Sequence, residues 1–180
     1  AYSIIAHGGY LLLALLAAND IGKAAMLFYL LTYAVTNIGA FGVISVLETT
    51  DHPNDRVRDY AGLWYTRPAL AGLMTVFLLS LGGIPPTAGF IGKWYIFSAA
   101  VQEGHYWLAV IGVLTSVVSV FFYLRIVVMM YMTEGQETLR PRIPVAAMAG
   151  LALAVVAVFY LGILPTRVLD LALDSISTIF

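Results

Sequence analysis

The stretch SLGGIPPTAGFIGKWYIF, residues 80–97, decides the fold of this chain. It begins apolar, is interrupted at Gly82-Gly83 and Pro85-Pro86, and then becomes apolar again, with Lys93 inside the second apolar run. Glycine and proline disfavour a helix interior, so the sequence predicts a helix that breaks near residues 81–87. A break and a cation within a hydrophobic segment both need a chemical reason.

The composition is that of an integral membrane protein. Of the 180 residues, 61% are hydrophobic and 11% are charged, and the mean hydropathy is +0.91. A soluble domain has about 25% charged residues. The chain has no cysteine, which excludes disulfides and thiolate metal sites. A net charge of −1 without a basic run argues against nucleic acid as a partner.

Several segments are apolar enough to be membrane spans, which need about 20 residues. The chain starts in one of them without an initiator methionine, so we expect it to be the tail of a longer protein. Residues 165–180 are a tail in which 169–179 form a short surface helix, with Asp170 and Asp174 on one side. The predicted fold is an all-α membrane protein with one transmembrane domain, 1–180. Its spans are residues 1–18, 24–47, 68–100 (broken), 106–132 and 143–164.

The positive residues outside the spans orient the predicted array, because cytoplasmic loops carry an excess of Lys and Arg. The outer side has only Lys23 and Arg167. The other side has five arginines in segments 48–67 and 133–142, so we expect it to be cytoplasmic and the C-terminus to lie on the outer face. The five are Arg56, Arg58, Arg67, Arg140 and Arg142.

Two cations, Arg125 and Lys93, fall inside the predicted spans. Arg125 is about 10 Å from the end of its helix at 1.5 Å per residue, so snorkelling and an intramembrane role both stay open. Lys93 lies near the membrane centre. Burial favours its uncharged amine, and the positive end of the second half-helix acts in the same sense. Such a lysine can take up and release a proton, as arginine cannot.

The helix break and Lys93 have a common explanation if both belong to one polar site inside the membrane. In hydrocarbon every backbone polar group needs a partner, so non-helical backbone persists only inside protein or beside water. Discontinuous helices of this kind mark ion or substrate sites in transporters. A plain proline kink explains the break alone, but the break together with Lys93 favours a proton site.

Other polar residues recur at helical spacing on three predicted helices. Packing between helices is the alternative reading, because small and hydroxyl residues are common where membrane helices touch. His7 is the strongest candidate, since histidine titrates near neutral pH and is rare in spans. With Lys93, and with Arg125 if it does not snorkel, these stripes would form a hydrated polar axis. They are Ser3, His7 and Tyr10; Tyr29, Tyr33, Thr36 and Asn37; and Gly112, Ser116, Ser119 and Tyr123.

The sequence contains no phosphate-binding loop, metal-ligand cluster or nucleophile–base pattern. It therefore predicts no metal site and no catalytic residue in the sense of bond-making chemistry.

Four stretches carry a resemblance to a known family. They are AYSIIAHGGYLL (1–12), RDYAGL (58–63), SLGGIPPTAGFIGKWYIF (80–97) and SVVSVFFYLRIVVMMYM (116–132). In order and spacing they resemble the last third of the sequence in the N-subunit family of proton-pumping NADH:quinone oxidoreductase, respiratory complex I. The resemblance covers nearly the whole chain.

The resemblance implies an antiporter-like fold of two inverted five-helix repeats, of which this chain would hold four helices of the second repeat and the last helix. It implies that Lys93 is a proton-channel residue, and it places His7 in a motif where relatives carry other polar residues. The sister antiporter-like subunits have a His and a Lys where this chain has Tyr33 and Asn37, so they match less well. The family's Glu–Lys pair on earlier helices is not in this sequence.

The function implied by the resemblance is proton translocation by a subunit in the bacterial inner membrane, without redox chemistry or cofactor in this chain. NADH, FMN, iron–sulfur clusters and quinone would bind partner subunits. The partners would be the lipid bilayer and other membrane subunits, among them a sister antiporter-like subunit. Two alternatives stay open: a subunit of a multisubunit cation/proton antiporter, against which Tyr33 and Asn37 argue, and a non-pumping scaffold, against which Lys93 argues.

Overall fold

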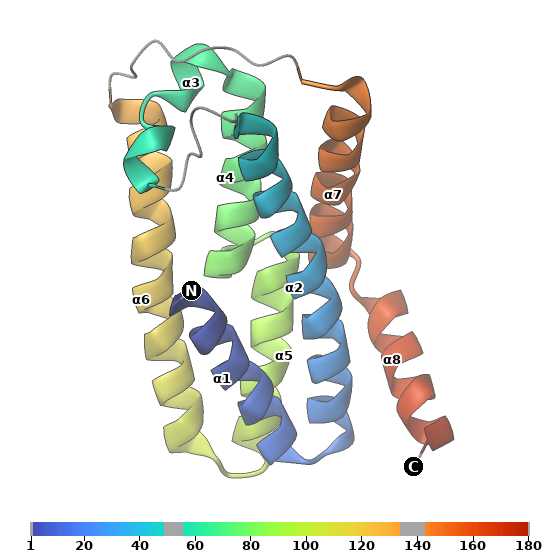
Figure 1. The fold of residues 1–180 in the computed structure, drawn as a ribbon. Helices are drawn as coiled ribbons and strands as arrows, with labels where there is room; N and C mark the ends of the chain where they lie inside the picture. The colour runs from blue at the N-terminus through green and yellow to red at the C-terminus, as the bar shows by residue number, and fades with distance from the viewer. Residues whose placement is uncertain (1, 49–55, 134–142, 180) are drawn as a thin grey trace.

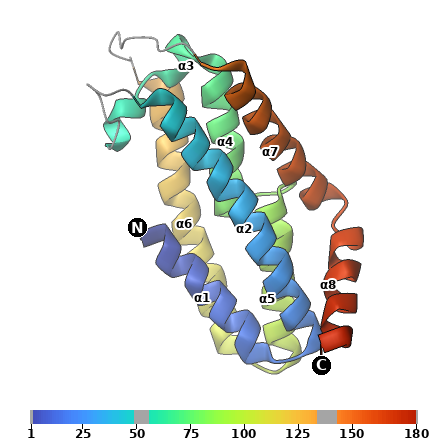
Figure 2. The same cartoon turned by 45° about the vertical axis from the view of Figure 1, so that its right-hand side comes forward.

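The computed structural model describes residues 2–48, 56–133 and 143–179, and these fold into helices only. The helices run roughly side by side, with a cap of short helices at one end (Figure 1). Figure 2 shows α7 and α8 following one another along one flank of the bundle. The elements are α1 (Tyr2–Ala17), α2 (Asp20–Leu47), η1 (Val57–Tyr60), α3 (Leu63–Thr66), α4 (Pro68–Gly82), α5 (Ala88–Gln102), α6 (Tyr106–Met132), α7 (Val145–Ile163) and α8 (Thr166–Ile179).

Helix α2 is the centre of the bundle and packs against α1, α4, α5, α7 and α8. One part of the core joins α2 to α4 and α7, with Phe77 and Val158 fully buried. A second part joins α1, α2 and α5 around Tyr29 and Ile96. Five helices therefore pack on α2, while Leu31, Ile38 and Phe41 leave another part of its surface exposed.

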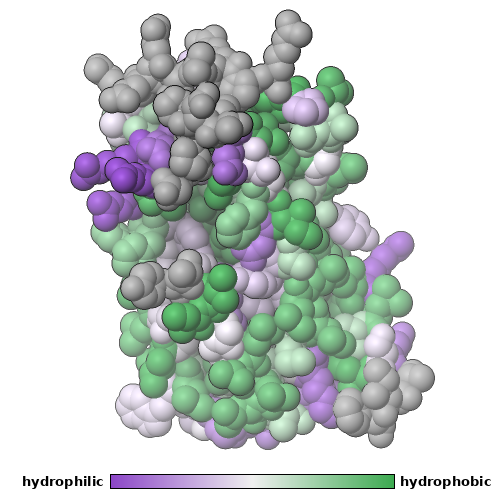
Figure 3. Space-filling model, in the orientation of Figure 1, coloured by the Kyte–Doolittle hydropathy of each residue, from purple (hydrophilic) through white to green (hydrophobic). Residues whose placement is uncertain are grey.

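The outer surface of the bundle is mostly hydrophobic on the face drawn in Figure 3. Among the described helices, α2, α6 and α7 are long and apolar enough to cross a membrane, and α1 and α4 are shorter apolar helices. On α6, Phe121 and Val117 are more than 60% exposed, which suits contact with lipid rather than water. The membrane character is thus clear, while a count of five spans stays a prediction.

The second helix begins earlier than the predicted residue 24. Asn19 caps it, because its side-chain oxygen accepts a hydrogen bond from the Gly22 N–H at 2.7 Å. Residues 20–23, which the predicted spans leave out, are therefore the first turn of α2, and Asn19 is a single cap residue.

The helix interruption lies between α4 and α5. Helix α4 ends at Gly82, and Gly83 adopts the left-handed conformation, with φ 81°, that ends many helices. The Ile84 N–H then donates to the Leu79 carbonyl at 3.0 Å, and α5 starts at Ala88. Figure 1 shows α5 continuing in the space beyond the end of α4.

The segment 48–67 was expected to be a loop, and its described part, 56–67, is different. It holds η1 and α3, because Tyr60 and Leu63 are apolar enough to be buried in the core. The Trp64 ring stacks on Tyr131 of α6 at 5.0 Å between ring centroids. The predicted polar segment 133–142, with Arg140 and Arg142, lies outside the described residues except for Thr133.

The C-terminal helix α8 begins at Thr166, three residues before the predicted 169–179 helix. Asp170 and Asp174 are exposed on it, as the spacing predicted, and Ala172 and Ile176 are buried against Ala24 of α2. One face of α8 therefore lies against the bundle.

Candidate functional site

Lys93 lies inside the protein, where only 4% of its surface is exposed. Its Nζ donates to the carbonyls of Leu81 and Gly82, each at 3.0 Å, and to the Ser116 hydroxyl at 2.9 Å. An ammonium group has three N–H donors, so these three oxygens satisfy it. The Tyr10 ring covers the remaining side, with Nζ 5.0 Å from its centroid.

The helix break is what makes this environment available. The last carbonyls of a helix have no partner within it and carry the negative end of its dipole. Leu81 and Gly82 stand in the last turn of α4, and Lys93 of α5 reaches back to them. The sequence predicts that burial and the positive end of the second half-helix both act on the amine. The structure also puts the amine against the negative end of α4, where carbonyl oxygens replace water around the cation.

Glycine is needed on both sides of this contact. A Cβ on Gly83 would lie 2.9 Å from the Lys93 side chain, and a Cβ on Gly89 would lie 1.9 Å from the Ser80 carbonyl oxygen. The absence of side chains at these positions lets α5 and its lysine approach the end of α4.

His7 forms a second polar centre where α1, α2 and α6 meet, and it is 3% exposed. Its Nδ1 is 2.6 Å from the Tyr29 hydroxyl, and its Nε2 is 3.4 Å from the Tyr123 hydroxyl. The imidazole stacks on the Tyr33 ring at 4.5 Å between centroids. Ser3 hydrogen-bonds the Tyr123 hydroxyl. Each histidine nitrogen thus has a hydroxyl partner that can either donate or accept.

Tyr10 contacts both centres. Its ring meets the His7 ring edge-on at 5.8 Å between centroids, and its centroid lies 5.0 Å from the Lys93 Nζ. Its hydroxyl is buried and has no hydrogen-bond partner among the described residues. One aromatic ring thus contacts both basic side chains.

A small polar cavity extends from His7 toward the helix break. It has about 10 Å³ of room for the centre of a water-sized sphere, close to the least that holds one water. The Thr36 and Ser80 hydroxyls are 3.2 Å apart in this region, and the Gly89 N–H donates to Ser80 Oγ at 3.3 Å. The cavity is lined by His7, Tyr29, Thr32, Tyr33, Thr36, Ser80, Leu81 and Gly89.

The structure brings together most residues of the predicted polar axis, from four helices. Ser80 and Thr32 belong to the same region but were not among the predicted site residues. The signal for Thr32 was its place between Tyr29 and Thr36 on one face of α2, and the signal for Ser80 was its position just before the break.

Two predicted axis residues lie apart. Asn37 is half-buried one turn beyond Tyr33, and no hydrogen bond joins it to these centres in the described part of the chain. Arg125 is exposed and lines a surface cleft with Arg56 and Arg58. Within the described ranges, no three His, Asp or Glu side chains gather as a metal site would need.

Comparison with known proteins places residues 1–119 in the family described as NADH:quinone oxidoreductase/Mrp antiporter, TM. NADH-quinone oxidoreductase subunit N of Trichlorobacter lovleyi is 49% identical over 181 residues, which cover 99% of this chain. A subunit N of Herpetosiphon aurantiacus is 46% identical over 181 residues, with the same coverage. The chain spans 37% of the length of each of these relatives.

Solved structures share the fold. A chain of respiratory complex I from Thermus thermophilus with bound aureothin matches 94% of this chain at 36% identity and a TM-score of 0.81, over 38% of its own length. A chain of the Mrp complex from a Dietzia species matches 96% of this chain at 24% identity and a TM-score of 0.84, over 40% of its own length. The second likeness shows the fold alone.

Proposed function

The chain belongs to the NADH:quinone oxidoreductase/Mrp antiporter transmembrane family, and from this premise we propose that it is the C-terminal part of a proton-translocating N subunit. Protons would move through a hydrated polar axis that contains Lys93 and His7. Their movement would be coupled to quinone reduction elsewhere in an NADH:quinone oxidoreductase. The curated relatives that match nearly the whole chain carry the name of this subunit.

The buried ammonium of Lys93 is the observation that carries the proposal. A charged side chain at the bilayer centre costs at least about 2.5–3.5 kcal/mol. Here two backbone carbonyls and a hydroxyl bind it. Among the described residues no carboxylate pairs with this cation. A site of that kind can hold a proton and also give it up, because no ion pair locks the charge.

His7 and Lys93 provide an electrostatic relay in this proposal. Both side chains contact the Tyr10 ring, so two positive charges there would repel each other. A proton arriving at His7 therefore favours release from Lys93, and a proton on Lys93 disfavours one on His7. The hydroxyls of Tyr29 and Tyr123 accept or donate as the histidine changes its protonation state.

We further propose that α4 and α5 form one interrupted membrane crossing, flanked by complete spans. The protein would lie in the bacterial inner membrane with its C-terminus on the outer face. Its partners would be the bilayer and other membrane subunits of the complex, including a sister antiporter-like subunit. NADH, FMN, iron–sulfur clusters and quinone would be bound by partner subunits, and this chain would supply no redox group.

A cation/proton antiporter subunit is the second candidate, because the family model joins both classes and the Mrp likeness has a high TM-score. That likeness rests on 24% identity, whereas subunits N of 46–49% identity match nearly the whole chain. A non-pumping scaffold is disfavoured by the lysine cage, which a scaffold has no need to keep.

The test replaces Lys93 in the full-length subunit within the assembled enzyme. Lys93→Ala removes the proton carrier, and Lys93→Arg keeps a charge that is not released near neutral pH. Both variants should assemble and lose most proton translocation per NADH oxidised, measured in sealed membrane vesicles. Lys23→Ala is the matched control, because it removes a lysine at the helix end near Asp20.

Wild-type translocation by an assembled Lys93→Ala enzyme would overturn the proposal. Sodium-dependent proton exchange in vesicles without NADH, lost in the same variant, would favour the antiporter instead.

A further inference from the structure

Three arginines that the polar axis does not use meet at one surface cleft. Arg125 of α6 lines it together with Arg56 and Arg58, which lie at the start of η1. The cleft has a volume of about 490 Å³, within the range of small-molecule sites. Its other lining residues are apolar: Val57, Phe122, Ile126 and Met129.

The fold holds the basic side of this cleft against α6. The Gly62 N–H donates to the Met129 carbonyl at 3.2 Å, and Tyr60 is buried in the core. These contacts fix the short segment that carries Arg56 and Arg58. The cleft is therefore formed by two anchored elements and not by a free loop.

The positive charge of the cleft is not neutralised within the described residues. None of the three guanidinium groups forms an ion pair with a carboxylate in residues 2–48, 56–133 and 143–179. The Asp59 carboxylate is engaged elsewhere, since it accepts the Arg56 backbone N–H at 2.9 Å. A ligand for this cleft should therefore be an anion.

The position on α6 identifies the kind of anion. Arg125 is about 10 Å from the end of the helix, and its neighbours Phe121 and Phe122 are 66% and 57% exposed. Figure 3 shows hydrophilic residues at the upper left, where Figure 1 places the end of α6, directly beside hydrophobic surface. Charge thus meets apolar surface on one face, as headgroup meets acyl chain in a lipid.

We propose that this cleft binds an anionic phospholipid. The guanidinium groups would bind the phosphate through paired N–H donors, and an acyl chain would lie along Phe122 and Ile126. Clusters of basic residues at membrane interfaces attract anionic lipids by about 1 kcal/mol for each Lys or Arg. The apolar half of the cleft selects a lipid over a free phosphate ion, which makes no use of it.

The experiment uses the assembled complex with the full-length subunit in lipid nanodiscs. The probe is phosphatidylglycerol with a photoactivatable group on its acyl chain, and cross-linked peptides are located by mass spectrometry. We expect labelling within residues 122–129 that unlabelled phosphatidylglycerol competes away and phosphatidylcholine does not. The apparent affinity of the probe, measured from the concentration dependence of this labelling, should fall about fivefold for Arg125→Gln. It should fall further in the variant R56Q/R58Q.

Arg167→Gln is the matched control, because Arg167 is an exposed arginine on α8 and does not line the cleft. It should leave labelling of residues 122–129 unchanged. Retained NADH oxidation shows that each variant assembles, and competition on the wild-type protein tests the site without any variant.

Three results would overturn the proposal. Equal labelling by photoactivatable phosphatidylcholine would show a non-selective apolar groove. Displacement by inorganic phosphate at the same concentration would show a free-anion site. No labelling of residues 122–129 in the assembled complex would mean that another subunit occupies the cleft.

Discussion

At the scale of single residues, three hydrogen bonds to oxygen atoms replace the hydration that the Lys93 ammonium loses on burial. Leu81 O, Gly82 O and Ser116 Oγ all lie within 3.0 Å of its Nζ. Hydrogen bonds to a charged group are worth about 1.5–3 kcal/mol each, so three of them offset a penalty of about 2.5–3.5 kcal/mol for a charge at the bilayer centre. The three acceptors therefore stabilise the buried cation.

Ser116 is the one side chain of this cage, and its removal tests the cage directly. Ser116→Ala deletes one of three acceptors, so the ammonium loses about 1.5–3 kcal/mol of stabilisation. We expect the assembled enzyme to translocate protons roughly tenfold more slowly. The readout is the initial rate of proton uptake by vesicles on addition of NADH.

Ser119→Ala is the control for that substitution. Ser119 is one turn further on α6 and donates its hydroxyl to the Thr115 carbonyl at 2.9 Å, not to Lys93. Equal slowing in both variants would point to a general effect on α6 and not to the lysine cage.

At the scale of elements, the interruption between α4 and α5 is a packed structure and not a gap. Gly83 ends α4 with a positive φ, and Gly89 brings the first turn of α5 against Ser80. Helix α7 packs on the same place, since a Cβ on Gly162 would lie 2.1 Å from the Pro86 carbonyl oxygen. The break is thus fixed from two sides, which keeps the carbonyls of Leu81 and Gly82 directed at the lysine.

Gly89→Ala tests this packing. The new Cβ meets the Ser80 carbonyl at 1.9 Å, so α5 has to move away from α4. Overpacking in a filled interior costs about 1–3 kcal/mol, and we expect a lower midpoint of thermal unfolding of the assembled membrane complex. Proton translocation should fall as well, because the lysine moves with α5.

Gly72→Ala is the matched control on α4, where a Cβ meets nothing within 4 Å. Its unfolding midpoint should equal or exceed that of the wild type, since alanine favours the helix. A Gly89→Ala complex as stable as this control would contradict the packing described here.

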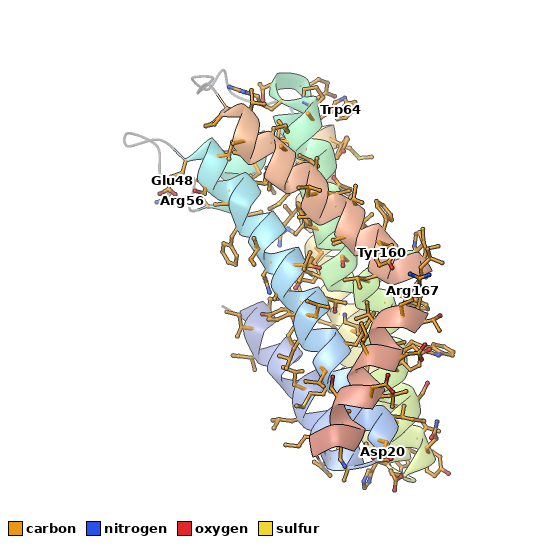
Figure 4. All side chains as sticks on the ribbon, turned by 90° about the vertical axis from the view of Figure 1, so that its right-hand side faces the viewer. Asp20, Glu48, Arg56, Trp64, Tyr160 and Arg167 are labelled. Carbon is orange, nitrogen blue, oxygen red and sulfur yellow. The ribbon has the colours of Figure 1, made fainter. Side chains whose placement is uncertain are left out.

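At the scale of the whole molecule, polar residues gather at both ends of the bundle. Figure 4 shows Glu48, Arg56 and Trp64 toward one end and Asp20 at the other. At the Asp20 end, the Asn19 Nδ2 donates to the Glu103 carboxylate at 3.1 Å. This hydrogen bond joins the start of α2 to the end of α5. The polar centres of Lys93 and His7 lie between the two ends.

The topology predicts opposite accessibility of the two ends. In a background without other cysteines, Asp20→Cys should react with a membrane-impermeant thiol reagent added to the outer face. Glu48→Cys should react only in inverted vesicles. The side chain of Asp20 is 79% exposed and Glu48 is exposed, so burial does not limit either reaction. Labelling of both from the same side would refute the predicted arrangement of spans.

The membrane class, the long apolar helices and the interruption near residues 81–87 were predictable from the sequence, because each depends on local composition, whereas η1 and α3 were not predicted. Hydropathy marks apolar helices wherever they pack, and glycine with proline ends a helix in any context. The boundaries at 47, 82, 132 and 163 follow from such local signals. Family membership was predictable too, since short ordered motifs carry it.

What only the tertiary structure decided is which groups meet. The sequence marked Lys93 as buried, but the acceptors of its protons belong to the end of another helix and to α6. The sequence left the role of Arg125 open, whereas the rotation of α6 turns it outward to Arg56 and Arg58. The rotation of a helix about its own axis, and the helices that it contacts, are set by packing among several segments far apart in the chain. No pattern within a single segment contains that information, because each helix is apolar on nearly all of its sides.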